Sequence, residues 1–312
     1  EKLKSSEWLA CWLKNFAAPK LKCVTTDKYA RICKNHIATK LGERELSELD
    51  AVVLQKFVAG LSERLAPNTV CGIVSVLKSS LKCAVEAGVT SKHFAGGICR
   101  PKPREKRVEC FSAAEQRRLE DFVIKSGSKK LFGIVFCLYT GLRIGELLAL
   151  KWKNIDVGRR VCRVVGTCRD SWENGKYKKV TDLPKTENSF RIVPIPRQLV
   201  PYLKQSGGKN AEKYFVEGRS GEGAQMRSYQ KTFKRLLEKL KIPHRGFHSL
   251  RHTFATRAIE CGMDVKTLSE ILGHKNVGVT LSRYAHSLTK HKTEMMDRVG
   301  RLLDRHEKKH AD

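Results

Sequence analysis

Apolar residues recur three and four positions apart through residues 1–99, which is the spacing of one face of a helix. Asn68 precedes one such stretch and is predicted as its N-cap, because an asparagine side chain can accept a hydrogen bond from the first turn. Four short helices joined by tight turns predict a compact helical domain. These helices are expected at about residues 8–16, 25–40, 50–64 and 69–88.

Residues 100–109 interrupt the helical pattern with two prolines, Pro101 and Pro103. Five basic residues and one acidic residue between Arg100 and Arg107 favour an extended, solvated path. We predict a basic linker that follows DNA phosphates, with an ordinary surface loop as the alternative.

The helical period returns after the linker, and a stretch of alternating apolar positions interrupts it once. A capping box begins this part at Ser112, and an Asn-Gly dipeptide at residues 174–175 is typical of a hairpin turn. Two or three antiparallel strands are expected between about residues 155 and 196. The predicted fold is therefore mainly α with a small antiparallel β-sheet (α+β), and the second domain spans residues 110–312. Its helices are expected at about residues 113–125, 129–140, 143–151, 197–205, 223–241, 248–261 and 265–272.

Composition and charge point to a packed protein that binds a polyanion. Of 312 residues, 41% are hydrophobic and 30% are charged, which suits about two domains and excludes a disordered chain. The net charge is +29 at pH 7, of which residues 1–99 carry +6 and the remainder carries +23. Nucleic acid fits best, because each Lys or Arg that meets a phosphate releases counterions. A solvated or ribosomal-type basic surface is the alternative.

The 11 cysteines include no Cys-x-x-Cys pair, and most lie in apolar runs. They are expected to be reduced and buried, rather than paired in disulfides or bound to zinc. No apolar run approaches the ~18 residues of a membrane helix, and no signal peptide is recognised. We expect a cytoplasmic protein with no membrane partner.

Four short segments carry residues suited to phosphoryl transfer. In the first, Arg143 follows a Thr-Gly-Leu turn at the start of a predicted helix, where its guanidinium can bind two phosphate oxygens. Glu146, three positions on, is an alternative partner for this arginine. In the second, Lys185 lies in a turn between predicted strands, where a lysine can donate a proton. Turn lysines are usually solvated, however, and Lys178 and Lys179 are nearby competitors.

In the third segment, His248 and Arg251 share one helical face because they are three positions apart. His248 and His252 have the spacing of a zinc-protease motif. That motif needs a glutamate directly after the first histidine, and Ser249 stands there instead. No metal ligand is therefore expected in this segment.

The fourth segment contains His274, after a Leu-Gly turn, and Tyr284 ten residues later. A lone tyrosine is usually packing, but together the segments supply a full set of groups for phosphoryl transfer. Arginines can neutralise charge on phosphate oxygens, and a phenol can attack phosphorus to give a phosphotyrosine. With a pKa of about 10, the phenol needs a cation or a histidine to help remove its proton. No cofactor or metal is expected for this chemistry.

In these motifs the chain closely resembles the tyrosine recombinase family, which includes phage integrases, Xer recombinases and integrases of conjugative transposons. The motifs are Thr-Gly-Leu-Arg followed by Glu-Leu, Pro-Lys-Thr, His-x-Leu-Arg-His, and Leu-Gly-His with a tyrosine ten residues after the histidine. They occur in the family's order between about residues 110 and 290, and residues 1–107 resemble the family in architecture alone. The resemblance implies a helical, SAM-like core-binding domain and a catalytic domain that close around double-stranded DNA.

The resemblance also implies a role for each of six residues at the reacting phosphodiester. They are Arg143 and Arg251 as phosphate-clamping arginines, Lys185 as the general acid towards the 5′-hydroxyl, His248 as the acceptor of the tyrosine proton, His274 as a hydrogen-bond donor to the phosphate, and Tyr284 as the nucleophile that forms a 3′-phosphotyrosine. His252 is expected to support the helix. The phosphotyrosine conserves the energy of the phosphodiester, so neither ATP nor metal is implied.

The family exchanges strands in two steps through a Holliday junction, within a tetramer on two DNA sites. The resemblance therefore implies site-specific recombination, namely integration or excision of a mobile element, with an accessory DNA-bending or excision factor as a further partner. The tail at residues 287–312 is implied to dock onto a neighbouring subunit, and the alternative is that it folds back on its own domain. A start at Glu1 rather than Met suits a truncated integrase that has lost an N-terminal arm-binding module.

Three other functions compete with this interpretation. A DNA-binding regulator can keep the fold without cutting DNA, although the complete catalytic set argues against it. A related topoisomerase would relax DNA without pairing two sites. A phosphodiesterase is less favoured, because hydrolysis normally uses a metal or an activated water rather than a tyrosine.

Overall fold

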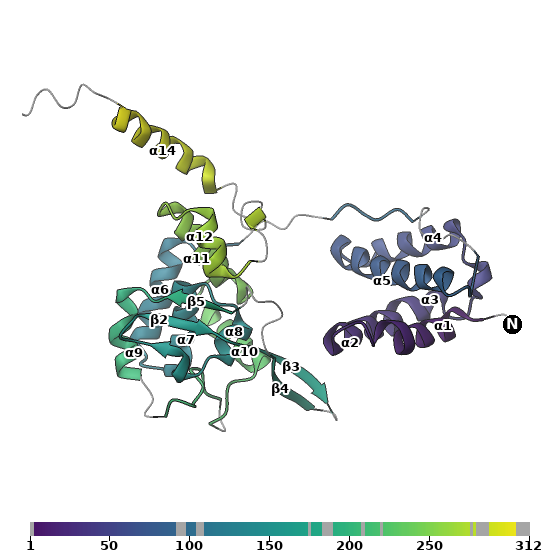
Figure 1. Ribbon diagram of the computed structural model, residues 1–312, viewed down its shortest axis with the longest axis horizontal. Helices are drawn as coiled ribbons and strands as arrows, with labels where there is room; N and C mark the ends of the chain where they lie inside the picture. Colours follow the sequence, from purple (N-terminus) through teal and green to yellow (C-terminus); the bar gives the residue numbers. More distant parts are fainter. Residues whose placement is uncertain are drawn as a thin grey trace, which may run out of the picture. The chain divides into compact units, whose positions relative to one another are not determined.

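The chain divides into two compact units, Glu1–Lys106 and Arg107–Asp312, and each has a hydrophobic core of its own (Figure 1). The predicted domains at residues 1–99 and 110–312, with a linker at 100–109, stay predictions. The computed structural model describes residues 3–91, 98–103, 109–173, 176–182, 190–206, 210–218, 221–274, 277–278 and 287–303.

The first unit is built from helices around a core that contains two tryptophans. The buried Trp8 indole Nε1 donates to the Ser80 carbonyl oxygen at 3.2 Å, so its polar atom is satisfied. Trp12 stacks on Tyr29, with ring centroids 5.9 Å apart. The elements are α1 (Ser5–Trp12), η1 (Leu13–Ala17), α2 (Cys23–Ile32), η2 (Cys33–Ile37), α3 (Ala38–Leu41), η3 (Leu46–Glu48), α4 (Ala51–Ser62) and α5 (Pro67–Glu86).

Two predictions for this unit need correction. Asn68 is not an N-cap: it lies inside α5, which begins at Pro67. Proline suits the first position of a helix because its backbone angle is already helical and the N–H it lacks would have no partner there. The helix expected from about residue 25 begins at Cys23, and it continues through the π-helical η2 into α3.

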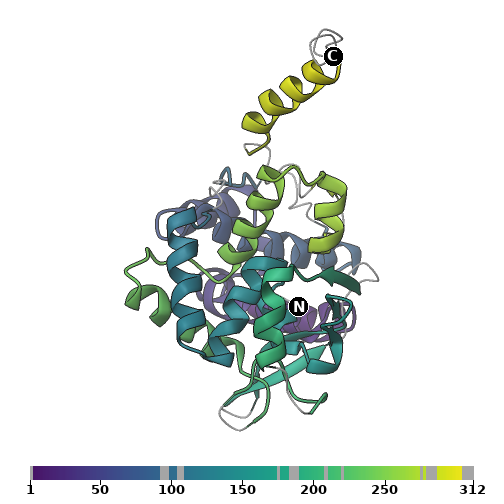
Figure 2. The same ribbon diagram turned by 90° about the vertical axis from the view of Figure 1, so that its left-hand side faces the viewer.

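The second unit packs helices against two small antiparallel sheets (Figure 2). One sheet has the order β1-β2-β5, and β3 pairs with β4 as a separate hairpin. The described residues contain five strands, which exceed the two or three predicted, and the predicted turn at residues 174–175 lies outside the described residues. The elements are α6 (Ala113–Lys125), α7 (Lys129–Thr140), α8 (Ile144–Ala149), η4 (Trp152–Asn154), β1 (Ile155–Asp156), β2 (Val161–Val164), β3 (Thr167–Glu173), β4 (Lys176–Asp182), β5 (Arg191–Pro194), η6 (Arg197–Leu199), α9 (Val200–Ser206), α10 (Met226–Lys239), α11 (His248–Glu260), α12 (Val265–Leu272) and α14 (Ser287–Leu303).

Asp170 and Lys179 face each other across the β3–β4 hairpin, and each contacts a different helix. The Asp170 carboxylate accepts hydrogen bonds from the backbone N–H groups of Met226 at 3.1 Å and Arg227 at 2.9 Å, at the start of α10. Lys179 Nζ donates to the Leu148 carbonyl oxygen at 2.9 Å, near the end of α8. An acid at a helix N-terminus and a cation at a C-terminus both complement the helix dipole. This pair therefore fixes the hairpin to two helices.

Helix α14 carries exposed apolar side chains in the part whose side chains are described. Met296, Val299, Leu302 and Leu303 all lie on the surface, and three of them, Val299, Leu302 and Leu303, form an apolar stripe that the spacing along residues 287–308 predicts together with Met295, which is half-buried. The partner that covers this stripe stays a prediction. Among the described helices, none combines the length and the apolar character that a membrane crossing needs.

Candidate active site

Arg143 stands where α7 ends and α8 begins. Gly141 ends α7 with a φ of 66°, in the left-handed region that favours glycine. A Cβ at this position would lie 2.5 Å from Cδ1 of Phe254, so a side chain has no room. The turn places Arg143 at the N-cap of α8, where its backbone N–H donates to Glu146 Oε2 at 2.8 Å. Arg143 Nη1 also donates to Glu146 Oε1 at 2.7 Å, so the partner considered from the sequence is present.

The Glu146 carboxylate is buried between two arginines. Arg191, from β5, donates through Nη1 to Oε1 at 3.0 Å and through Nη2 to Oε2 at 2.9 Å, while Arg143 binds the same two oxygens. Burial alone would raise the pKa of Glu146, but the hydrogen bonds and charge of Arg191, together with the charge of Arg143, outweigh it and hold this pKa at about 2. Glu146 is therefore ionised at neutral pH.

Arg251, on α11, is the second predicted clamp arginine, and its side chain is 2% exposed. Nη1 donates to the Gly141 carbonyl oxygen at 2.9 Å, and Nη2 donates to the Leu272 carbonyl oxygen at 2.6 Å. Each of these nitrogens carries a second N–H. The arginine thus joins the Thr-Gly-Leu-Arg segment to the Leu-Gly-His segment, and its contact with phosphate stays a prediction.

Helix α12 ends in a Schellman motif that sets the backbone position of His274. Gly273 has a φ of 62°, and its N–H donates to the Glu270 carbonyl oxygen at 3.0 Å. The His274 N–H donates to the Ser269 carbonyl oxygen at 3.0 Å. Two carbonyl groups at the end of the helix are satisfied in this way.

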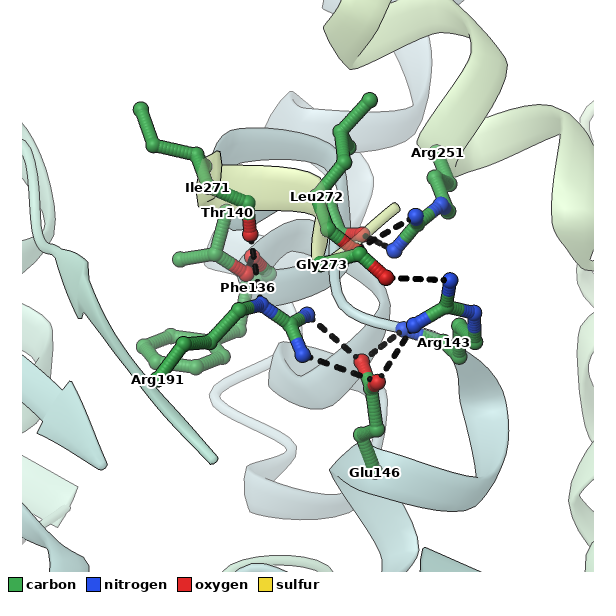
Figure 3. Close-up of polar contacts among 10 residues, drawn as sticks. Phe136, Thr140, Arg143, Glu146, Arg191, Arg251, Ile271, Leu272 and Gly273 are labelled. Carbon is green, nitrogen blue, oxygen red and sulfur yellow. Dashed lines mark hydrogen bonds and ion pairs between the residues drawn. The ribbon is translucent and has the colours of Figure 1, made fainter. Parts of the chain in front are cut away.

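The next three carbonyl oxygens each accept a hydrogen bond from a different arginine (Figure 3). Three cations at the C-terminal end of one helix complement the negative end of its dipole. They also hold the turn that carries His274 against the start of α8. The bonds are Arg191 Nε to Ile271 O at 2.6 Å, Arg251 Nη2 to Leu272 O at 2.6 Å and Arg143 Nη2 to Gly273 O at 3.1 Å.

The predicted histidines lie on the elements expected of them. His248 is the first residue of α11 and is exposed, and its ring is perpendicular to that of His252 with centroids 4.6 Å apart. His274 is half-buried beside Gly273. In the part of the chain that is described, no group of three or more His, Cys, Asp or Glu side chains is arranged to hold a metal.

Lys185 and Tyr284 lie outside the described residues, so the general acid and the nucleophile at these positions stay predictions. Lys179, one competitor for the general-acid role, lies in β4, where burial lowers the pKa of its ammonium group. Its Nζ is 3.6 Å from the centroid of the Tyr214 ring and is hydrogen-bonded to Leu148. This lysine holds the hairpin against its neighbours.

Arg191 is the site residue that the sequence reasoning missed. The alternation along β5 shows that Arg191 and Val193 share one face and that Phe190 and Ile192 share the other, but only the structure shows that the face of the arginine is the buried one. An arginine on the same buried face of a strand as a valine needs a carboxylate partner, because an unpaired buried charge is costly. Two arginines around one carboxylate leave a net positive site, and Arg143 is 37% exposed there. A centre of this kind, with two arginines around one carboxylate, is suited to bind an anionic group such as a phosphate.

Comparison with known families identifies the class more closely. Residues 111–291 match the model described as "Phage integrase family", and residues 6–62 match "Phage integrase, N-terminal SAM-like domain". The chain therefore belongs to the phage integrase family of tyrosine recombinases, enzymes that cleave and rejoin DNA in site-specific recombination. The family membership and the mainly helical fold with small antiparallel sheets, both predicted from the sequence, are confirmed.

Individual relatives extend over most of the chain. A XerC-like tyrosine recombinase of Caldanaerobacter subterraneus subsp. tengcongensis is 31% identical, with 94% of this chain and 81% of the relative covered. The transposase from transposon Tn916 of Enterococcus faecalis is 30% identical over 59% of this chain and 46% of its own. The ICEBs1 integrase of Bacillus subtilis is 27% identical over 85% of this chain and 72% of its own.

Two solved structures share the fold. A fragment of the Tn1549 transposon integrase, in complex with transposon right end DNA, has a TM-score of 0.79 and 22% identity, with 96% of this chain and 100% of that chain covered. A lambda integrase dimer bound to a core site has a TM-score of 0.69 and 17% identity, with 90% and 77% covered.

Proposed function

We propose that this enzyme integrates or excises a mobile DNA element through a 3′-phosphotyrosine formed by Tyr284. The relatives include a transposon transposase and an ICE integrase, which supports a mobile element as the substrate. The observation that carries the proposed site is the set of three arginines on successive carbonyl groups at the end of α12. It brings Arg143, Arg251 and the turn of His274 together, which supports a shared role at one phosphate.

The proposed reaction needs no outside energy source. The Tyr284 oxygen forms a bond to phosphorus while the bond to the 5′-oxygen breaks, and His248 accepts the phenol proton. Lys185 gives a proton to the leaving 5′-oxygen. Arg143, Arg251 and His274 stabilise the charge that builds on the non-bridging oxygens. Attack by a 5′-hydroxyl from another strand reverses these steps and rejoins the DNA, so two such exchanges pass through a Holliday junction.

The first unit is proposed to hold the DNA. A hollow of about 500 Å³ there has an apolar part, and its remaining lining is formed by Glu63 and by the basic side chains of Lys40, Arg44, Lys56 and Arg64. Basic side chains over a concave surface suit the phosphate backbone of a duplex. We further propose that four subunits assemble on two DNA sites through the tail at residues 287–312, and that an accessory DNA-bending or excision factor assists them.

The test uses nicked duplexes that carry the element's junctions, incubated with the protein in EDTA. A nick beside the cleavage point lets the short strand diffuse away, so a covalent adduct accumulates and survives a denaturing gel. Peptide mapping should find the DNA on Tyr284, and Tyr284→Phe should bind the same duplex without forming the adduct. An adduct elsewhere would overturn the nucleophile. No adduct on a duplex that the protein demonstrably binds would favour a DNA-binding regulator.

A further inference from the structure

We propose that Arg191 is a positioning residue of the reaction, which aligns Arg143 and the turn of His274 on the scissile phosphate. The inference rests on the proposed function, because it takes Arg143 and His274 as the groups that meet the phosphate. The proposal assigns a role to Arg191, which contacts Glu146 and the end of α12 rather than the phosphate itself.

All three guanidinium nitrogens of Arg191 are engaged with protein. Nη1 and Nη2 hold the two oxygens of Glu146 as a fork, and Nε holds the Ile271 carbonyl oxygen at 2.6 Å. The side chain is 7% exposed, and that of Glu146 is 5% exposed. A planar guanidinium held at both ends has one orientation. Arg191 is thus a rigid brace between β5, α8 and α12.

Glu146 transmits this orientation to Arg143. Each Glu146 oxygen accepts one hydrogen bond from Arg191 and one from Arg143, through Nη1 of Arg143 for Oε1 and the backbone N–H of Arg143 for Oε2. Arg191 therefore holds the Glu146 carboxylate in one orientation, and in that orientation both carboxylate oxygens also accept hydrogen bonds from Arg143. Without the fork of Arg191, the Glu146 side chain can rotate, and the Arg143 guanidinium rotates with it.

Arg191 also supports the turn that carries His274. A Cβ at Gly273 would lie 2.9 Å from Arg191 Nη1 and 3.1 Å from its Cζ, so the backbone of the turn rests directly on the guanidinium. The bond from Arg191 Nε to the Ile271 carbonyl oxygen adds a second contact two residues earlier, in the last turn of α12. Glycine is therefore favoured at position 273 for two reasons. It has no side chain to collide with Arg191, and it readily adopts the left-handed backbone conformation found there.

The charge of Glu146 depends on the same two arginines. Among the described residues, the thiols of Cys137 on α7 and Cys162 on β2 also interact electrostatically with Glu146, and burial raises the pKa of both. These thiols stay neutral, so Arg143 and Arg191 supply the cationic charge that keeps Glu146 ionised. A variant without the Arg191 fork should protonate Glu146 at a higher pH and lose the alignment of Arg143 as the medium is acidified.

The experiment compares Arg191→Lys with Arg257→Lys as a matched control. Lysine keeps the charge but has no fork, so it cannot bind both oxygens of Glu146 and the Ile271 carbonyl at once. Arg257 likewise binds a carboxylate, Glu260, and a backbone carbonyl, that of Phe111, but on the outer part of α11. Both variants and the wild type are measured for DNA affinity, for melting, and for the single-turnover rate of adduct formation on the nicked duplex.

Arg191→Lys should bind DNA as the wild type does and form the adduct about 10- to 100-fold more slowly, because small misplacements of catalytic groups have effects of this size. Arg257→Lys should stay within about two-fold of the wild type. The rate of Arg191→Lys should also fall at acidic pH values where the wild-type rate is still level. If Arg191→Lys does not fold, Arg191→Gln replaces it. A rate within about two-fold of the wild type would overturn the proposal.

Two modified duplexes identify the group through which Arg191 acts. A methylphosphonate at the scissile position removes a charge from the phosphate and so reduces the need for aligned arginines. On this duplex, Arg191→Lys should form the adduct at most about three-fold more slowly than the wild type. A 5′-bridging phosphorothiolate gives a better leaving group, relieves the need for a general acid, and should leave the deficit unchanged. The opposite pattern would place the effect on Lys185 and overturn the proposal. Absence of any wild-type adduct would instead contradict the proposed function.

Discussion

Arg251 and Gly141, which are 110 residues apart in the sequence, are joined by a hydrogen bond of 2.9 Å from Nη1 to the carbonyl oxygen. The bond brings the helix of the His-x-Leu-Arg-His motif to the turn that precedes Arg143. Because Arg251 is almost completely buried, it can be satisfied only where the carbonyl group of Gly141 points towards it. The backbone conformation at Gly141 therefore helps to position Arg251 in the proposed active site.

Gly141→Ala should destabilise the second unit. A left-handed conformation costs a residue with a Cβ about 1–2 kcal/mol, and the clash with Phe254 adds about 1–3 kcal/mol of overpacking. Gly127→Ala is the control, because Gly127 has a similar φ of 59° with open space around it. Urea unfolding should show a clearly larger loss of unfolding free energy for Gly141→Ala than for Gly127→Ala. Equal losses in the two variants would mean that Phe254 moves aside freely.

Glu146→Gln should lower the stability of the second unit at pH 7, and the difference from the wild type should vanish in acid. The folded state lowers the pKa of Glu146 from 4.5 to about 2. A lowered pKa stabilises the folded protein above the unfolded value and loses this contribution as the pH falls through the folded value. The size of the shift corresponds to about 3 kcal/mol, lost between about pH 5 and pH 2. Urea unfolding of both proteins across this range measures it.

Glu212→Gln is the matched control for this prediction. Hydrogen bonds from Lys153 and Lys151 lower the pKa of Glu212 to about 2 as well, but this carboxylate lies in water. Solvent screens exposed ion pairs, so the substitution should change the unfolding free energy far less. If Glu212→Gln and Glu146→Gln lose stability equally, burial between two arginines is not what makes Glu146 important.

DNA affinity should fall steeply with salt concentration. With a net charge of +29 and about 6–10 phosphate contacts, the affinity should drop about 10³-fold or more between 50 and 200 mM salt. Lys56→Gln, which removes one cation from the hollow of the first unit, should reduce the slope of log affinity against log salt by about one. Fluorescence anisotropy with a labelled duplex gives both values. An affinity that does not change with salt concentration would contradict DNA binding through phosphate contacts.

Local patterns allowed much of the fold to be predicted from the sequence. Ser112 was expected to cap a helix, and its hydroxyl accepts the Glu115 N–H at 3.2 Å, while the Glu115 carboxylate accepts the Ser112 N–H. The helices that carry Arg143 and Arg251 were expected at the positions where they occur. These features depend on residues within one turn of each other, so a local pattern contains the necessary information.

Arg191 could not be found in that way, because its partners are distant in the sequence. Glu146 lies 45 residues before it and Ile271 lies 80 residues after it. An alternating strand shows which residues share a face, but it does not show which face is buried. Here Phe190 and Ile192 are exposed although they are apolar, and Arg191 lies on the inner face with Val193. Tertiary packing overrides the simple hydrophobic pattern at this strand.

The cross-strand pair Asp170 and Lys179 has a consequence for protein engineering. The hairpin of β3 and β4 projects from the rest of the second unit, which makes it a convenient segment to exchange between related integrases (Figure 1). Its attachment is electrostatic and directional, because one residue of the pair binds the start of α10 and the other the end of α8. A chimera that exchanges the tip of the hairpin beyond this pair keeps both attachments, whereas one that replaces the whole hairpin must bring matching helix ends with it.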